Sequence, residues 1–138
     1  MFGPLLYLYV GSNDVARDLA YYRETLGAER VFDFAHFGTR VAAVRFAEGP
    51  LWLIAEHRPA PSVLPIYGVT NLEAAMAELT SRGWVATSDP LGVPNGMAVV
   101  FTDPSGNQIA LLQNDHPDAM ERAYADPQNT HAMRDEGG

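Results

Sequence analysis

One stretch of the sequence decides the fold: residues 102–112, which read Thr-Asp-Pro-Ser-Gly-Asn-Gln-Ile-Ala-Leu-Leu. Pro104 suits the first central position of a tight turn, and both Gly106 and Asn107 tolerate the left-handed conformation. A β-branched and aromatic run at 99–101 precedes this turn, and an apolar run at 109–112 follows it. The pattern predicts a β-hairpin.

A second stretch, residues 13–27, predicts an amphipathic helix. Four apolar side chains recur at intervals of four, three and four residues, which places them on one helix face: Val15, Leu19, Tyr22 and Leu26. Ser12 or Asn13 is suited to cap the start of this helix, and Gly27 to end it.

Together the two stretches resemble the vicinal oxygen chelate superfamily, which includes glyoxalase I, extradiol dioxygenases, fosfomycin-resistance enzymes and bleomycin-resistance proteins. The opening pattern of the family matches Asp14, Tyr21-Tyr22-Arg23 and Leu26-Gly27, and its closing Asp-Pro-x-Gly-Asn matches residues 103–107. The resemblance covers residues 5–114. It is specific for the fold and says little about the activity that the fold carries.

The spacing of like positions predicts an internal duplication. Asp14 and Asn71 lie 57 residues apart, and Gly27 and Gly83 lie 56 apart, as expected of a repeated βαβββ unit. We expect strands at 5–10, 29–34, 39–46 and 51–55, then at 66–69, 84–87, 97–101 and 109–112, with a loop at 89–94. The predicted modules are residues 1–57 and 58–114, followed by a polar tail at 115–138, all within one fused domain. The fold class is α+β, and the resemblance implies that the two tandem βαβββ modules form one cupped mixed β-sheet.

Composition excludes several classes of function. The net charge of −8 argues against nucleic-acid binding, and half of it comes from the tail. No run of about 18 apolar residues is present, so we expect no membrane span. The sequence has no cysteine and no basic region of a secretory signal at its start, which fits a cytoplasmic protein.

The resemblance also implies where a metal would be held. Metal-dependent members use about four side chains, mostly His, Glu or Gln, and their positions carry over to Tyr7, Trp52, Leu64 and Ala110. Leucine, alanine and tryptophan offer no usable lone pair, and one tyrosine does not hold a divalent ion alone. A shift of register adds only Gln108 as a weak candidate, because residues 61–71 contain no His, Asp, Glu or Gln. We therefore expect no metal and no cofactor.

The candidate ligand-binding residues combine aromatic walls with a few polar groups, as suits a flat or amphipathic small molecule: Tyr7, Tyr9, Arg40, Trp52, Met97 and Phe101. An arginine here could pair with a ligand carboxylate. The alternatives are plain core packing for the apolar side chains and a solvated position for the arginine. The four histidines, at positions 36, 57, 116 and 131, are expected at the surface.

Three hypotheses for function follow, and none has an assigned catalytic residue. The first is a metal-independent small-molecule binding protein, similar to the bleomycin-resistance branch, which sequesters its ligand and forms a homodimer. The second is a metal-dependent lyase or dioxygenase that resembles glyoxalase I or extradiol dioxygenase. The third is a metal-free lyase or isomerase with Tyr7 or Tyr9 as its acid.

Overall fold

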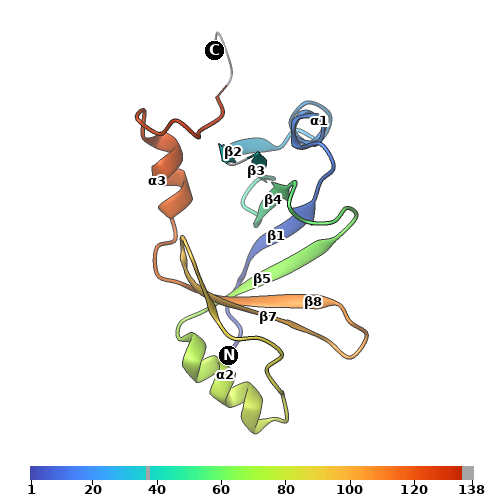
Figure 1. Ribbon diagram of the computed structural model, residues 1–138, viewed down its shortest axis with the longest axis vertical. Helices are drawn as coiled ribbons and strands as arrows, with labels where there is room; N and C mark the ends of the chain where they lie inside the picture. Colours follow the sequence, from blue (N-terminus) through green and yellow to red (C-terminus); the bar gives the residue numbers. More distant parts are fainter. Residues whose placement is uncertain (37, 135–138) are drawn as a thin grey trace. The chain divides into compact units, whose positions relative to one another are not determined.

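The computed structural model describes residues 1–36 and 38–134 (Figure 1). The described elements repeat one order, strand, helix and three strands. The first set is β1 (Leu5–Gly11), α1 (Val15–Ala20) with its wider continuation η1 (Tyr21–Thr25), β2 (Glu29–His36), β3 (Thr39–Arg45) and β4 (Leu51–Ala55). The second set is β5 (Val63–Val69), α2 (Leu72–Ser81), β6 (Leu91–Val93), β7 (Gly96–Thr102) and β8 (Gln108–Asn114), and α3 (Ala119–Ala125) follows. The α+β class and the repeated βαβββ order are confirmed.

The chain forms two compact units, each named here after its main helix. The α1 unit contains residues 8–63 and the C-terminal residues from Met120 onward. The α2 unit contains residues 1–7 and 64–119. The predicted module boundaries at residues 57 and 114 stay a prediction.

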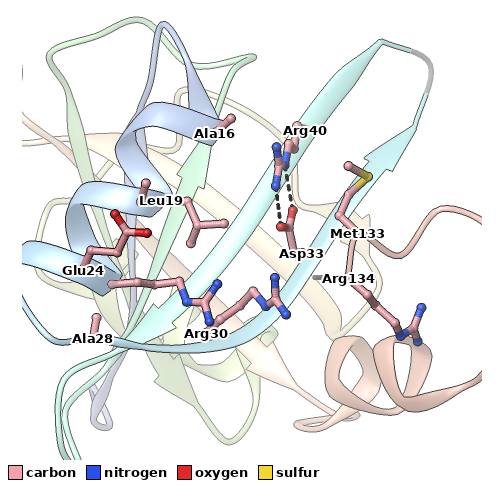
Figure 2. Close-up of a pocket in the computed structure, with 11 residues that line it drawn as sticks. Ala16, Leu19, Glu24, Ala28, Arg30, Asp33, Arg40, Met133 and Arg134 are labelled. Carbon is pink, nitrogen blue, oxygen red and sulfur yellow. Dashed lines mark hydrogen bonds and ion pairs between the residues drawn. The ribbon is translucent and has the colours of Figure 1, made fainter. Parts of the chain in front are cut away.

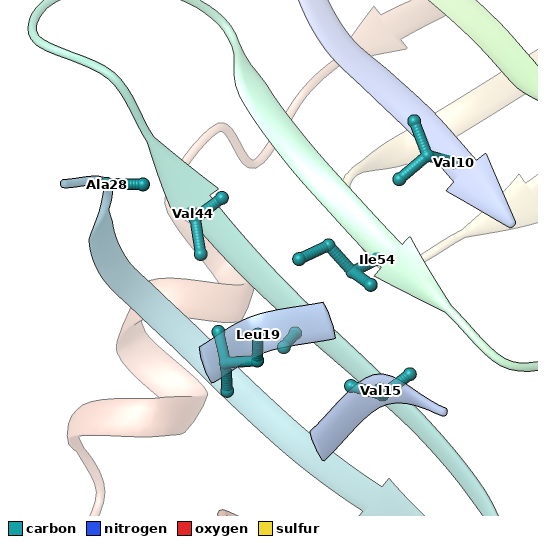
Figure 3. Close-up of a cluster of buried hydrophobic side chains, with 7 residues drawn as sticks. Val10, Val15, Leu19, Ala28, Val44 and Ile54 are labelled. Carbon is teal, nitrogen blue, oxygen red and sulfur yellow. The ribbon is translucent and has the colours of Figure 1, made fainter. Parts of the chain in front are cut away.

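In the α1 unit the strands lie in the order β2-β3-β4-β1. β3 is antiparallel to both β2 and β4, and Val44 lies opposite Trp52. Alternate residues of these strands pack under α1 because side chains on a strand point to opposite faces in turn. Figure 3 shows the resulting core cluster, which contains Val10, Val15, Leu19, Ala28, Ala42, Val44 and Ile54.

The start of α1 differs from the prediction by one residue. Asp14, not Ser12 or Asn13, is the cap: its backbone is extended and its side chain accepts a hydrogen bond from the backbone N–H of Arg17 at 3.0 Å. Ser12 supports the cap from behind, since its hydroxyl oxygen accepts from the N–H of Asp14 at 3.1 Å. The carboxylate reaches the third N–H of the helix, which is the usual target of a capping side chain.

In the α2 unit the strands lie in the order β5-β8-β7-β6, with β5 parallel to β8 and the other pairs antiparallel. Asn71 caps α2, accepting from the N–H of Ala74 at 2.8 Å. The predicted hairpin is confirmed: Thr102 pairs with Gln108 across the turn. The core of this unit contains Val69, Leu72, Ala75, Val99, Phe101 and Leu111.

One predicted strand is wrong. Residues 84–87 form no strand, and β6 lies instead in the segment predicted to be a loop. Trp84 donates its backbone N–H to Leu79 at the end of α2, and its ring meets Phe101 edge-on with centroids 5.5 Å apart. The ring of Trp84 therefore packs against the core of the α2 unit. The next residue, Val85, is 78% exposed.

The chain beyond α3 pairs with β2. Ala132 forms a bridge to Phe34 on β2, and Met133 donates its N–H to the carbonyl of Asp33 at 2.7 Å. Residues 135–138 lie outside the described part of the chain. Within the described ranges, no helix combines the length and apolar character needed to span a bilayer.

Candidate functional site

Three of the four positions that the family resemblance assigns to metal ligands lie buried in the α2 unit: Tyr7, Leu64 and Ala110, each at most 8% exposed. Ile66 lies opposite Ala110 in the parallel β5–β8 pair, so Leu64, two residues earlier, shares the face of Ala110. The Tyr7 hydroxyl accepts a long hydrogen bond from the amide of Asn95, at 3.3 Å. The side chains of Leu64 and Ala110 bring only apolar surface to this face.

The fourth position, Trp52, lies in the α1 unit and faces α1. Its ring packs against Tyr22 and Phe46, with centroids 6.0 and 6.1 Å apart. The assignment of Trp52 to the second metal position stays a prediction. A register shifted by one residue would select Leu51 or Leu53 on the opposite face, and neither leucine is a metal ligand.

The donor set therefore does not fit a divalent ion. Among residues 1–36 and 38–134, no group of three or more His, Cys, Asp or Glu side chains is close enough together to hold a metal. Tyrosine, leucine and alanine at the family positions supply one phenolic oxygen where the metal would need three or four ligands.

A polar cluster occupies the other face of the α1 unit, where Tyr9, His57 and Arg58 meet. Val10 belongs to the core under α1, so Tyr9 beside it points away from that helix. The Tyr9 hydroxyl lies 2.5 Å from Nε2 of His57, and the two rings meet edge-on. The guanidinium carbon of Arg58 lies 5.2 Å from the centre of the Tyr9 ring, within the range of a cation–π contact.

The protonation of Tyr9 follows from this environment. Burial raises the pKa of Tyr9 above its usual 10.0, and the positive charge of Arg58 opposes the rise only in part. The phenol is therefore neutral at pH 7, and its hydroxyl forms a hydrogen bond with Nε2 of His57. The cluster can offer a ligand a phenol, an imidazole and a guanidinium on one side of the sheet.

The other predicted ligand-binding residues do not gather around Tyr9. Arg40 lies on the α1 side and forms an ion pair with buried Asp33, through Nε to Oδ1 at 2.9 Å and Nη2 to Oδ2 at 2.6 Å. The hydrogen bond with Asp33 raises the pKa of the guanidinium further above its usual value. Met97 and Phe101 lie on the α2 side of the other unit, Met97 in the lining of a cavity of about 480 Å³ and Phe101 in the core. The predicted set is thus divided between two faces and two units.

Sequence reasoning missed two contacts, those of Tyr9 with His57 and of Arg40 with Asp33. All four histidines are exposed, as predicted, but His57 also contacts Tyr9, which is 48 residues earlier in the chain. No local pattern reveals that pairing. Asp33 did carry a signal, because a carboxylate between Phe32 and Phe34 on a buried strand requires a cation nearby.

Comparison with protein families gives one match over most of the chain. The model of the Glyoxalase/Bleomycin resistance protein/Dioxygenase superfamily matches residues 5–111. No curated protein sequence matches the chain.

Solved structures with the same fold are distant in sequence. A hypothetical protein from Bacillus halodurans C-125 aligns with a TM-score of 0.66 at 13% identity, over 78% of this chain and 91% of that one. Methylmalonyl-CoA epimerase from Mycobacterium tuberculosis aligns with a TM-score of 0.64 at 16% identity, over 78% and 85%. A variant of 4-hydroxymandelate synthase from Streptomyces coelicolor aligns with a TM-score of 0.64 at 11% identity, over 82% of this chain but 39% of the synthase. At these identities the likeness shows the fold alone.

Proposed function

Because the chain belongs to the glyoxalase/bleomycin resistance protein/dioxygenase superfamily, we propose that it is a metal-independent small-molecule binding protein of that fold. One observation carries the proposal: the positions that the family resemblance assigns to metal ligands are occupied here by Tyr7, Trp52, Leu64 and Ala110. A site of this composition favours apolar contact over coordination. The protein then acts by holding its ligand, in the manner of sequestration.

The Tyr9 cluster supports a ligand with both aromatic and polar character. The phenol of Tyr9, the imidazole of His57 and the guanidinium of Arg58 are three polar groups around one aromatic ring. Pockets for small molecules commonly join apolar walls to a few such groups, which set the orientation of the ligand. We also propose a homodimer, as the family resemblance implies. From composition and charge we propose a cytoplasmic location, with no nucleic-acid or membrane partner.

A second function, metal-dependent lyase or dioxygenase, is favoured by the named relatives. An epimerase and a hydroxymandelate synthase share the fold, so the fold is compatible with catalysis. This function requires a divalent ion on the protein. A third, metal-free proton transfer through Tyr9 and His57, rests on their 2.5 Å contact.

The deciding experiment is the metal content of the purified protein, before and after incubation with manganese, iron, nickel and zinc. Far less than one ion per chain, together with thermal stabilisation by aromatic ligands from a screen, supports the binding protein. The Tyr9→Phe variant should bind the ligands found by the screen more weakly. Tyr21→Phe serves as the matched control, because Tyr21 is an exposed tyrosine on η1. One tightly held ion per chain would refute metal independence and make the enzyme the better account. Light scattering tests the dimer.

A further inference from the structure

A cavity of about 480 Å³ lies beside the start of α2 in the α2 unit. Its lining comes from the first two turns of the helix, from the segment before β6, and from the paired ends of β7 and β8: Leu72, Glu73, Met76, Pro90, Met97 and Gln113. The proposed function does not use this cavity. We propose that it is a second binding site, for a small hydrophobic amine that carries a positive charge at pH 7.

The outermost strand of this sheet is too small to cover the cavity. β6 has three residues, against the eight of β2, which is outermost in the other unit. Gly92 of β6 lies opposite Met97 of β7, and paired residues present their side chains to the same face. Because Gly92 has no side chain, Met97 keeps 40% of its surface exposed. The end of the sheet therefore presents open apolar surface to the cavity.

Apolar side chains form most of the lining: Leu72, Met76, Pro90 and Met97. The two methionine side chains are flexible and polarisable, so they adapt to ligands of different shapes and contact aromatic rings well. A volume of about 480 Å³ falls within the range of small-molecule sites. These features suit a ligand with an aromatic hydrocarbon body.

A cavity beside α1 has a different chemistry. It measures about 570 Å³, and Figure 2 shows charged side chains along its walls, among them the ion pair of Asp33 with Arg40. In the cavity beside α2, Glu73 is the one charged side chain among the lining residues that the structure describes. The sign of this one charge therefore decides which ligands the cavity favours.

The other polar side chain of the lining, Gln113, already has its partners. Its Oε1 accepts a hydrogen bond from the N–H of Leu72 at 2.8 Å, and its Nε2 lies 3.1 and 3.2 Å from the two carboxylate oxygens of Asp115. These bonds hold β8 against the start of α2. The N–H of Ala74 likewise donates to the Asn71 cap. Two donors at this end of the helix are thus occupied, and an anionic ligand would gain little from them.

The exposed Glu73 carboxylate is available to a ligand. Within residues 1–36 and 38–134, the structure gives this side chain no hydrogen bond and no ion pair. The α2 unit contains six Asp or Glu side chains, no lysine and one arginine, Arg82, which contacts Glu78 at 2.8 Å. An ammonium group on the ligand would gain a carboxylate partner while its hydrocarbon body contacts the methionines. This combination favours a protonated amine over a neutral or an anionic molecule.

The test measures the binding of four probes to the full chain by calorimetry: phenethylamine, phenethyl alcohol, phenylpropanoate and ethylamine. The first has both a positive charge and a ring, the second lacks the charge, the third carries the opposite charge, and the fourth lacks the ring. We expect phenethylamine to bind one per chain. Its affinity should exceed that of each other probe by about fivefold or more.

Glu73→Gln removes the charge of the site. It should weaken the binding of phenethylamine by about fivefold, the effect of one exposed ion pair, and change that of phenethyl alcohol by less than about twofold. Glu78→Gln is the matched control, because Glu78 is an exposed residue of the same helix and lies outside the cavity lining. It should change the binding of phenethylamine by less than about twofold.

Gly92→Leu tests the apolar part of the site without a change of charge. A Cβ at Gly92 would lie 3.9 Å from Sδ of Met97, an ordinary contact, so a larger side chain fits beside Met97 and takes up space next to it. The variant should weaken the binding of phenethylamine by about tenfold, as expected when the contact surface of one apolar side chain is lost. Gly92→Ala should weaken it less. These variants decide the outcome if Glu73→Gln fails to fold.

Four results would overturn the site: phenethylamine does not bind, the alcohol or the anion binds as well, Glu78→Gln weakens binding as much as Glu73→Gln, or Gly92→Leu binds undiminished. The test is independent of the proposed function, because these residues belong to the α2 unit, Tyr9 belongs to the α1 unit, and none of them occupies a metal position. A stoichiometric metal would refute metal independence and leave the amine site standing.

Discussion

Substitutions of the two partners in the Arg40–Asp33 ion pair should destabilise the protein by unequal amounts. Asp33 is fully buried, whereas the side chain of Arg40 keeps a fifth of its surface in solvent. Arg40→Gln leaves a carboxylate in the interior without its cation, which costs about 3–5 kcal/mol when the charge is well desolvated. Asp33→Asn leaves a guanidinium that can still reach water, so the loss should be nearer 1–2 kcal/mol. The Arg40 variant should therefore be the less stable by about 2 kcal/mol.

The assay is urea unfolding, and the chain supplies a probe in each unit. Trp52 reports on the α1 unit and Trp84 on the α2 unit. A fall in the midpoint at constant slope measures the loss of stability. The double variant Arg40→Gln/Asp33→Asn removes both charges and should recover much of the loss of Arg40→Gln, as expected for a coupled pair. If Arg40→Gln costs no more than Asp33→Asn, or the double variant recovers nothing, the carboxylate is not desolvated and the reasoning fails.

Three further predictions concern single residues. Asp14→Ala should lower the free energy of unfolding by about 1 kcal/mol through loss of the helix cap on Arg17, as measured by urea unfolding; no change would mean that the cap contributes nothing. Because burial raises the pKa of Tyr9, its contribution to stability should be present below pH 10 and lost as the pH rises through the folded-state value. In an ultraviolet titration, Tyr9→Phe should remove one late-titrating tyrosine, and an unchanged profile would contradict the shift. Gly96→Ala should destabilise by at least about 2 kcal/mol in thermal unfolding, because its Cβ would lie 2.0 Å from the Gln113 carbonyl oxygen at a φ of +153°; a stable variant would show that β7 can move there.

Features with a local physical cause were predictable. The apolar stripe at Val15 and Leu19 and the turn at 103–107 each depend on residues a few positions apart, whereas Leu26, predicted on the same helix face, is 45% exposed. The sequence also placed poor metal ligands at the family positions, since the identity of Leu64 and Ala110 needs no coordinates. The assignment of Trp52 stays a prediction, and its neighbours Leu51 and Leu53 are no better as metal ligands.

Features that depend on contacts between distant segments were not predictable. Tryptophan is common in strands, but Trp84 packs against Phe101 in the core instead of forming a strand. The strand β6 forms further along the chain. The sequence predicts a ligand carboxylate as the partner of Arg40. The structure shows that its partner is Asp33, which the pairing of β2 with β3 brings beside it. The sequence predicts Tyr9 as an aromatic wall of a ligand site. Its contact with His57 depends on the pairing of β4 with β1, which brings the end of β4 close to Tyr9.

The return of the C-terminal segment to β2 has a consequence for self-association. β2 is the outermost strand of its sheet, and an uncovered outer strand is a template on which another chain can add a strand. Here His131 and Met133 occupy that outer row, through the N–H of Ala35 and the carbonyl of Asp33. His131 and Met133 thus protect the protein against edge-to-edge aggregation, and a chain shortened before residue 129 should precipitate more readily than the full one.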